Sequence, residues 1–361
     1  MPNDNRTITF AEAICEATDF CLGDDPSVYL IGLGVSDPGA IFGTTRGLYQ
    51  KYGDERIVEM PTSESALTGI AIGSAVLGQR PIMTHQRVEF SLFAFENIIN
   101  TAAKMRYTTN GKLSVPIVIR LIIGRGWGQG PCHAQSLESV FGHIPGLNVV
   151  MPTTAHDAKG MLISAVKDDD PTIFIEHRWL HSTTGHVPEG GYEVPLDQTR
   201  TVTTGNDITI VASSLMTLEA MLVAKVLEEV RVGVDLIDLR SVRPLDMSQI
   251  NTSVAKTGRL LCIDSGWTTY GVGGEIIARL AETGSDKFRM PPRRMGMADY
   301  PSPSTRALIS EYYPFPDQIL EQCLEMLQLP ASQNDAAISA MVKLQNNRRV
   351  DVPNADFSGP F

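Results

Sequence analysis

The chain has 361 residues, of which 43% are hydrophobic and 20% are charged, as in ordinary globular proteins. Its formal net charge of -11 and its pI of about 5.1 argue against a general affinity for nucleic acid or for an anionic membrane surface. No apolar stretch is long enough to span a bilayer, and the start of the chain has no apolar signal core.

The first half of the chain alternates between short apolar runs and helical patterns. The apolar runs predict buried strands, and their alternation with helices predicts a parallel sheet that is covered by helices on both faces. The expected strands are 28–35, 80–84, 115–121, 148–151 and 172–176, and the expected helices are 8–20, one beginning at Glu64, 90–107, one beginning near Leu137, and 155–166.

A stretch rich in Gly, Pro and Thr predicts a linker at 186–204, between a domain at 1–185 and a second domain at 205–330. The fold class expected is therefore α/β, with two doubly wound domains of mainly parallel sheets. Residues 331–361 are polar with a weak helix, and such tails are more often disordered or partner-docking than part of a core. The second domain's expected strands are 208–212, 234–239, 259–264 and one near Arg294, and its expected helices are 216–230, 247–256, 273–282 and 316–327.

Glu64 opens an apolar helical pattern that carries no other charge before Arg80. Ser63 or Thr62 is placed to cap this helix, which puts Glu64 in its first turn. An acid in the first turn stabilises a helix through the helix dipole. Taken alone, this segment favours that role for Glu64 over a catalytic one.

Two polar loops follow predicted strands, at the sheet edge where open parallel folds bind ligands. They are THQRVEF at 84–90 and GRGWGQGPCHAQS at 124–136, whose four glycines suggest a close approach of the backbone. The chain has no GxGxxG, no P-loop and no GxSxG motif, which disfavours nicotinamide, P-loop nucleotide and serine hydrolase chemistry. Its five cysteines form no CxxC pair and its histidines have no metal-ligand spacing, so we expect reduced thiols, no metal site and a cytoplasmic location.

At these loops the sequence resembles the beta subunit of the 2-oxo acid dehydrogenase first component. That family includes the pyruvate, branched-chain and acetoin enzymes and belongs to the thiamine-diphosphate-dependent, transketolase-like group. The resemblance is collinear from about Thr7 to about Leu327 and implies a pyrimidine-binding domain at 1–185 and a transketolase C-terminal-like domain at 205–330. It is carried by ERIVEMPTSESALTGIAIGSAVLGQRPI, ENIINTAAKMRY, CHAQSLESVFGHIPGLNVVMPTTAHDAKG, DLRSVRPLD, KTGRLL and YYP.

The resemblance assigns roles to three residues. Glu64 matches the glutamate that hydrogen-bonds a ring nitrogen of the cofactor's aminopyrimidine, which favours the tautomer able to remove the thiazolium proton. Phe90 matches the aromatic residue that packs against that ring, and His133 matches the histidine that faces the substrate and the incoming lipoyl group. The family has serine where this chain has Ala134. The resemblance favours a catalytic role for Glu64 over the helix-dipole role. Without the resemblance, His133 could equally be a loop residue that hydrogen-bonds backbone groups.

Four further residues are candidates for the substrate pocket: His85, Arg87, Trp127 and Gln135. His85 and Arg87 stand where many family members have other residues, so we expect them to shape substrate choice. Trp127 fits either the entrance to the pocket or a subunit contact. Two other residues have commoner roles, since His143 fits a packing position and Glu89 fits a solvated or interface acid.

The sequence lacks the GDG-type motif with its downstream Asn that binds Mg²⁺ and the diphosphate in such enzymes. The family carries that motif on an alpha subunit, which implies a two-alpha, two-beta assembly that shares thiamine diphosphate between chains. Many family members also carry an acid at the position of Leu33, as part of a path between two active sites, and this chain has none there.

The function expected is that of a beta subunit of a 2-oxo acid dehydrogenase, which decarboxylates a pyruvate-like acid and passes the acyl group to a lipoyl acyltransferase. The alternative is a split transketolase-like carboligase or decarboxylase subunit in a biosynthetic pathway, without a lipoyl partner. A non-catalytic homologue is a third class. The joint presence of Glu64, Phe90 and His133 counts against it.

Overall fold

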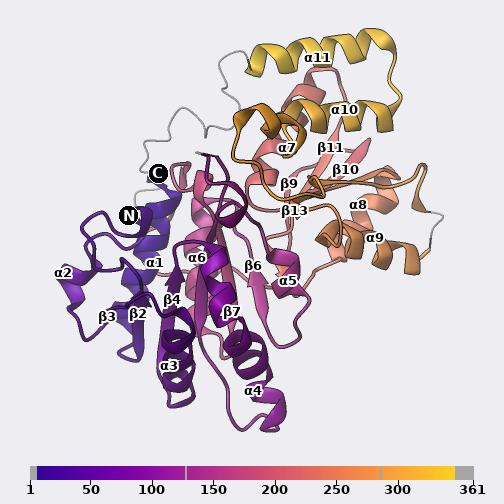
Figure 1. Cartoon of the computed structure of the whole chain (residues 1–361). Coiled ribbons are helices and arrows are strands. Elements are labelled where there is room, and N and C mark those ends of the chain that lie inside the picture. Colours follow the sequence, from indigo (N-terminus) through magenta and orange to yellow (C-terminus); the bar gives the residue numbers. More distant parts are fainter. Residues whose placement is uncertain (1–5, 127, 285–286, 346–361) are drawn as a thin grey trace.

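The computed structural model describes residues 6–126, 128–284 and 287–345. Two sheets, each sandwiched by helices, form the two bodies seen in Figure 1, with the first half of the chain at lower left and the second at upper right. In the larger sheet the edge strand Ser241–Arg243 pairs antiparallel with its neighbour, and all other neighbouring strands pair in parallel. In spatial order its strands are β12 (Ser241–Arg243), β6 (Asn148–Val150), β7 (Thr172–His177), β5 (Val118–Ile123), β4 (Arg80–His85), β2 (Val28–Gly32) and β3 (Ile57–Glu59).

The second sheet has five strands, of which only β9 is antiparallel to its neighbour. The two strands Ile208–Ala212 and Val234–Asp238 are buried along their whole length, as expected for a sheet covered on both faces. In spatial order the five strands are β14 (Arg293–Met297), β13 (Leu260–Trp267), β10 (Ile208–Ala212), β11 (Val234–Asp238) and β9 (Arg200–Thr203), and a separate ribbon pairs β1 (Thr7–Thr9) with β8 (Thr184–His186).

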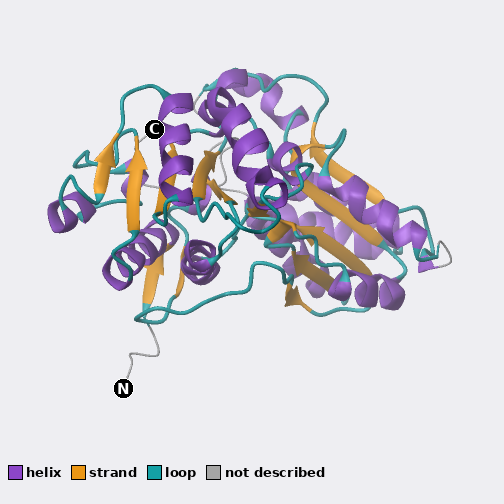
Figure 2. Cartoon of the chain, turned by 90° about the horizontal axis from the view of Figure 1, so that it is seen from below, coloured by secondary structure: helices purple, strands orange, loops and turns teal. Residues whose placement is uncertain are grey.

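Helices lie on both sides of the strands in each body (Figure 2), so the predicted α/β class with two doubly wound domains is confirmed. The first helix shows how local sequence sets a boundary, because Thr9 and Glu12 form a reciprocal capping box at its start. The α-helices are α1 (Phe10–Asp24), α2 (Leu48–Tyr52), α3 (Glu64–Val76), α4 (Ala103–Thr108), α5 (Glu138–Gly142), α6 (Ala155–Lys167), α7 (Leu215–Glu229), α8 (Ser248–Thr257), α9 (Val272–Glu282), α10 (Pro316–Leu327) and α11 (Ala331–Gln345).

The expectation of one regular helix over 90–107 is wrong in its geometry. The chain there forms a 3₁₀ segment η2 (Val88–Ala94), a π segment η3 (Asn97–Ala102) and then α4. Asn97, at the start of the π segment, donates from Nδ2 to the carbonyl and the Oγ of Ser65, at 2.9 and 3.1 Å. This tertiary contact ties the segment to the first turn of α3, and periodicity alone does not reveal it.

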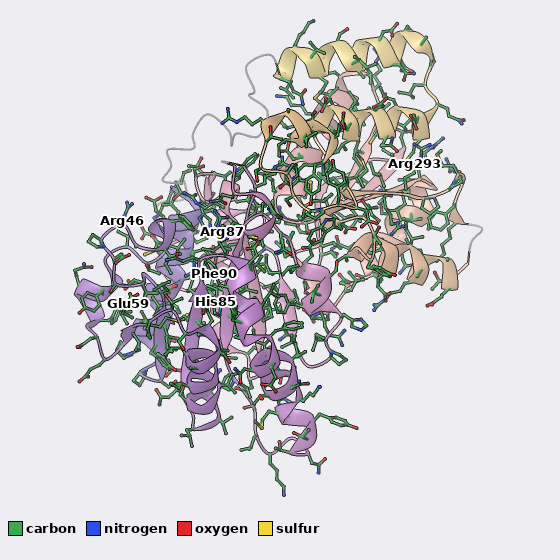
Figure 3. All side chains as sticks on the ribbon, in the orientation of Figure 1. Arg46, Glu59, His85, Arg87, Phe90 and Arg293 are labelled. Carbon is green, nitrogen blue, oxygen red and sulfur yellow. The ribbon has the colours of Figure 1, made fainter. Side chains whose placement is uncertain are left out.

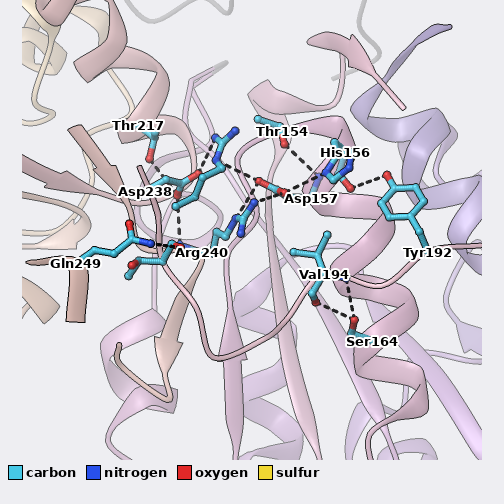
Figure 4. A network of polar contacts seen from close by, with 12 residues as sticks. Thr154, His156, Asp157, Ser164, Tyr192, Val194, Thr217, Asp238, Arg240 and Gln249 are labelled. Carbon is cyan, nitrogen blue, oxygen red and sulfur yellow. Dashed lines mark hydrogen bonds and ion pairs between the residues drawn. The ribbon is translucent and has the colours of Figure 1, made fainter. Parts of the chain in front are cut away.

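The two domains meet through β12 and a buried network of ion pairs (Figure 4). Arg240, just before β12, donates to both carboxylate oxygens of Asp157 in α6, at 3.1 and 2.7 Å. Arg200 of β9 binds Asp238 of β11 at 3.1 Å and lies 3.5 Å from Asp157. The second domain therefore contributes one strand to the sheet of the first domain and an arginine that pairs with its Asp157.

The expected polar tail includes α11, which packs against α10 and α7 (Figure 1). Ala337 and Met341 of α11 are fully buried, whereas Ile338 and Val342 are half exposed. A partner-docking role for 331–361 stays a prediction. No helix among the described residues is both long enough and apolar enough to cross a bilayer.

Candidate functional site

The two polar loops singled out from the sequence lie at the same edge of the larger sheet. Strands β4 and β5 are parallel neighbours, so their carboxyl ends, at His85 and Ile123, open on the same side. Figure 3 labels His85, Arg87 and Phe90 within this region of the first domain. The topology thus brings the 84–90 and 124–136 loops together.

A buried carboxylate joins the two loops. Glu89 is only 8% exposed, and its Oε1 accepts a hydrogen bond from the backbone N–H of Gln135 at 2.8 Å. Its Oε2 is buried and has no hydrogen-bond partner among the described residues. Burial raises the pKa of Glu89, against the opposing effects of this backbone bond and of nearby Arg87 and His133. Glu89 is therefore not a solvated acid, since its carboxylate is buried where the two loops meet.

Phe90 and His133 are in direct contact. Their ring centroids are 5.6 Å apart and the planes meet at 71°, an edge-to-face arrangement between two half-buried side chains. The Nδ1 atom of His133 is buried without a hydrogen-bond partner among the described residues. The structure therefore brings the predicted aromatic and the predicted histidine together and leaves the histidine with an unused polar atom.

The loop of His133 is also held by the second domain. Ser302 donates from Oγ to the carbonyl of Ala134 at 3.2 Å and contacts the hydroxyl of Tyr312 at 3.0 Å. The Ala134 side chain is buried, so the methyl group occupies the position of the family's serine without a polar contact of its own. The second domain therefore holds Ala134 through its backbone carbonyl and not through its side chain.

Glu64 begins α3 and is half buried. The expected cap is wrong: Ser63 is the N-cap residue, but its side chain forms no capping hydrogen bond and its φ of -154° and ψ of 60° lie outside the usual cap geometry. The helix start is instead held by the bonds from Asn97 to Ser65, and α3 packs against η2, the segment that carries Phe90. Glu64 thus lies on a helix that contacts the Phe90 segment.

The substrate-pocket candidates have different surroundings. His85 is 3% exposed, and burial lowers its pKa to about 4, so it is neutral at physiological pH. Arg87 is also buried, and Gln135 is half buried with its backbone bound to Glu89. Trp127 lies outside the described residues. His143 is exposed and lines a groove whose walls come from both domains, so it is not a packed residue.

An acid of β3 that the sequence did not single out binds the loop after β2. Glu59 accepts hydrogen bonds from the backbone N–H groups of Gly34 and Ser36, at 2.5 and 3.0 Å (labelled in Figure 3). The chain has Leu33 where family members have an acid, yet a carboxylate from β3 lies against the same loop. Only the strand register, which pairs Glu59 with Gly32, could have revealed this.

Two further buried acids lie behind the 124–136 loop. Glu138 accepts from Ser136 Oγ at 2.6 Å and from the Gly266 N–H of the second domain at 2.7 Å. Burial and the neighbouring Glu138 raise the pKa of Asp264 to about 7. Over the residues that the structure describes, no group of three His, Cys, Asp or Glu side chains could hold a metal ion.

Comparisons with known proteins define the class of chain to which this site belongs. The family description "Transketolase, pyrimidine binding domain" matches residues 6–182, and "Transketolase, C-terminal domain" matches residues 197–319. A solved structure of a "Split gene transketolase, inactive beta4 tetramer" has the same fold, with a TM-score of 0.73 at 20% identity over 89% of this chain and 99% of that one.

Curated relatives are more similar in sequence. Acetoin:2,6-dichlorophenolindophenol oxidoreductase subunit beta of Cupriavidus necator is 38% identical over 87% of this chain and 96% of its own length. The protein of the same name from Bacillus subtilis is 35% identical over 90% and 99%. Pyruvate dehydrogenase E1 component subunit beta-2, mitochondrial, of Oryza sativa is 36% identical over 87% and 85%. The chain belongs to the beta subunits of the 2-oxo acid dehydrogenase first component, within the transketolase-like family.

The site's residues fit the pyrimidine end of thiamine diphosphate, the cofactor that this family implies. Phe90 offers a half-buried aromatic ring, and His133 Nδ1 and Glu89 Oε2, which have no hydrogen-bond partner among the described residues, are polar atoms that a ligand can satisfy. All three residues lie within the matched pyrimidine-binding region. These residues fit one side of the cofactor's pyrimidine ring.

Proposed function

We propose that this chain is the beta subunit of a thiamine-diphosphate-dependent 2-oxo acid dehydrogenase, which decarboxylates a 2-oxo acid and passes the acyl group to a lipoyl acyltransferase. The observation that carries the proposal is the contact between Phe90 and His133 beside the helix of Glu64, in a chain whose relatives are beta subunits over nearly their full length. When bound, thiamine diphosphate supplies the electron sink for decarboxylation.

Each of three side chains has a role that its environment supports. Glu64, at the open start of α3, hydrogen-bonds a ring nitrogen of the aminopyrimidine and holds the proton there. Phe90 packs against that ring and fixes its orientation. His133, with a free Nδ1 and a ring held by Phe90, moves a proton at the substrate oxygen or stabilises its developing charge.

This chain supplies half of the site in the proposal. It lacks a motif for Mg²⁺ and the diphosphate, and an alpha subunit in a two-alpha, two-beta assembly is proposed to bring both. The proposal also includes a cytoplasmic location, which is supported by five scattered free cysteines of the kind found in reducing compartments.

The test is reconstitution with the alpha subunit and separate addition of lipoyl acyltransferase and of a second carbonyl compound. The proposal predicts that the 2-oxo acid is decarboxylated and that the lipoyl group is reductively acylated. Ketol formation with no acylation of lipoamide would instead establish the carboligase alternative. Absence of any decarboxylation by the assembled complex would refute both functions. With coenzyme A, dihydrolipoyl dehydrogenase and NAD+ added, the formation of NADH measures the reductive acylation of the lipoyl group.

A further inference from the structure

The backbone directly after His133 is held from both domains. The carbonyl of Ala134 accepts a hydrogen bond from Ser302 Oγ of the second domain at 3.2 Å. The N–H of Gln135 donates to Glu89 of the first domain at 2.8 Å. Ala134 and Gln135 follow His133 in the chain, so these bonds restrict where the imidazole can lie.

Glu138 joins the next residue of this loop to the second domain. Its Oε2 accepts from Ser136 Oγ at 2.6 Å, and its Oε1 accepts from the backbone N–H of Gly266 in β13 at 2.7 Å. Glu138 and Ser136 are only 1% and 6% exposed. A buried carboxylate is costly unless its oxygens are hydrogen-bonded, and here each oxygen accepts one bond.

The contact between the loop and β13 is a close approach. A Cβ on Gly266 would lie 2.9 Å from Glu138 Oε1 and 3.0 Å from the carbonyl oxygen of Ser136, both shorter than ordinary van der Waals contact. Glycine therefore allows β13 to lie directly against the loop. Because Glu138 also begins α5, one residue connects the end of the loop, a helix of the first domain and a strand of the second.

Resting on the proposed function, we infer that Glu138 is a positioning residue for His133, which it holds in place through Ser136 on one side and Gly266 on the other. His133 moves a proton or stabilises charge in that function, and both tasks depend on where its ring lies. Glu138 acts from behind the loop and needs no contact with substrate or cofactor. Loss of its bonds lets the loop shift, and a misplacement of about 1 Å can lower a rate by about 10²-fold.

The kinetic test uses the complex with the alpha subunit. Glu138→Met keeps the length of the side chain and removes both acceptors, and Ser136→Ala removes one donor. Both should lower kcat for decarboxylation with KM nearly unchanged, and the loss in Glu138→Met should be about 10- to 10²-fold. Glu138→Gln should keep most of the rate, because its amide can accept from Gly266 and donate to Ser136. If Glu138→Gln is as slow as Glu138→Met, the role does not act through these bonds and the inference fails.

A double-mutant cycle with His133→Ala shows whether Glu138 acts through the histidine. If it does, Ser136→Ala and Glu138→Met lower kcat when His133 is present and have little further effect in the His133→Ala background. An equal loss in both backgrounds would place the effect elsewhere and overturn the inference.

A spin label on Cys132 measures the loop without cofactor, substrate or alpha subunit. Cys132 precedes His133 and is exposed, whereas the other four cysteines are buried or partly buried. We expect the label to be more mobile in Ser136→Ala and Glu138→Met than in the wild type, and Cys132→Ser gives the background from labelling elsewhere. Ser136→Ala removes only a hydroxyl group, so it keeps the test informative if Glu138→Met does not fold. Unchanged mobility in Ser136→Ala would overturn the inference.

Ser253→Ala is the matched control for Ser136→Ala. Ser253 is a buried serine whose hydroxyl donates to the carboxylate of Asp235 at 2.5 Å, near the amino-terminal end of β11. Its loss also removes a buried hydrogen bond to an acid and should lower stability in the same way. It should leave kcat and the mobility of the label unchanged.

The two assays separate this inference from the proposed function. No decarboxylation of any 2-oxo acid by the wild-type complex refutes the function, whereas the label tests the bonds of Glu138 without it. An active complex in which Ser136→Ala and Glu138→Met change neither kcat nor label mobility leaves the function standing and overturns the inference.

Discussion

Replacement of Glu64 by Gln is expected to lower the rate of 2-oxo acid decarboxylation by the assembled complex by about 10²- to 10⁴-fold, the usual contribution of a positioned acid or base. The amide keeps the size of the side chain but cannot hold or release the proton at the pyrimidine nitrogen. Because Glu64 is half buried at a helix start, the free energy of unfolding should change by no more than about 1 kcal/mol. Stopped-flow assay of decarboxylation and denaturant melts measure the two effects.

Glu275 is the matched control for the simpler role of a helix-dipole partner. It is an exposed first-turn acid of α9, so Glu275→Gln should change stability by a similar amount and leave turnover intact. Near wild-type turnover in Glu64→Gln would remove Glu64 from the proposed chemistry and leave it only the dipole role.

Arg120→Met is expected to lower the free energy of unfolding by about 3–5 kcal/mol, since removal of one partner leaves a buried charge uncompensated. Arg120 of β5 donates to both oxygens of Glu176 in β7, at 2.6 and 3.0 Å, and both side chains are 0% exposed. Urea denaturation followed by circular dichroism measures the loss. Arg106→Met, which breaks an exposed ion pair with Asp170, should cost at most about 1 kcal/mol.

The Arg120–Glu176 pair also makes the stability of the protein depend on pH in the acid range. Burial opposes ionisation of Glu176, but the charge of Arg120 and a hydrogen bond from His181 outweigh it and lower its pKa from 4.5 to about 2. A carboxylate with a lowered pKa contributes stability that is fully present above its unfolded pKa and is lost as the pH falls through its folded one. The difference in the free energy of unfolding between wild type and Arg120→Met should therefore become smaller as the pH falls from 4.5 to about 2. A difference that stays constant over this range would contradict the pairing.

Patterns within single segments were enough to predict most of the fold. Strand β10 and helix α10 have the predicted bounds, because an apolar run and a proline at a helix start are local signals. Features that depend on contacts between distant segments could not be predicted in this way. Strand β12 has three residues and joins a sheet built from the other domain, and η3 is shaped by the contact of Asn97 with Ser65.

The same distinction between local patterns and tertiary contacts applies to the residues of the candidate site. The family resemblance named Glu64, Phe90 and His133, and the structure brings the last two into contact. The roles of Glu59 and Glu89 depend on which backbone N–H groups their carboxylates reach, and that depends on strand register and loop packing. The sequence position of a charged residue does not show which backbone groups its side chain reaches.

We propose above that this chain holds one half of a shared thiamine diphosphate site. Isothermal titration calorimetry with thiamine diphosphate and Mg²⁺, on the chain alone and on its complex with the alpha subunit, tests it most directly. We expect no tight binding to the lone chain and tight, magnesium-dependent binding to the complex. Tight, magnesium-dependent binding to the lone chain would contradict it.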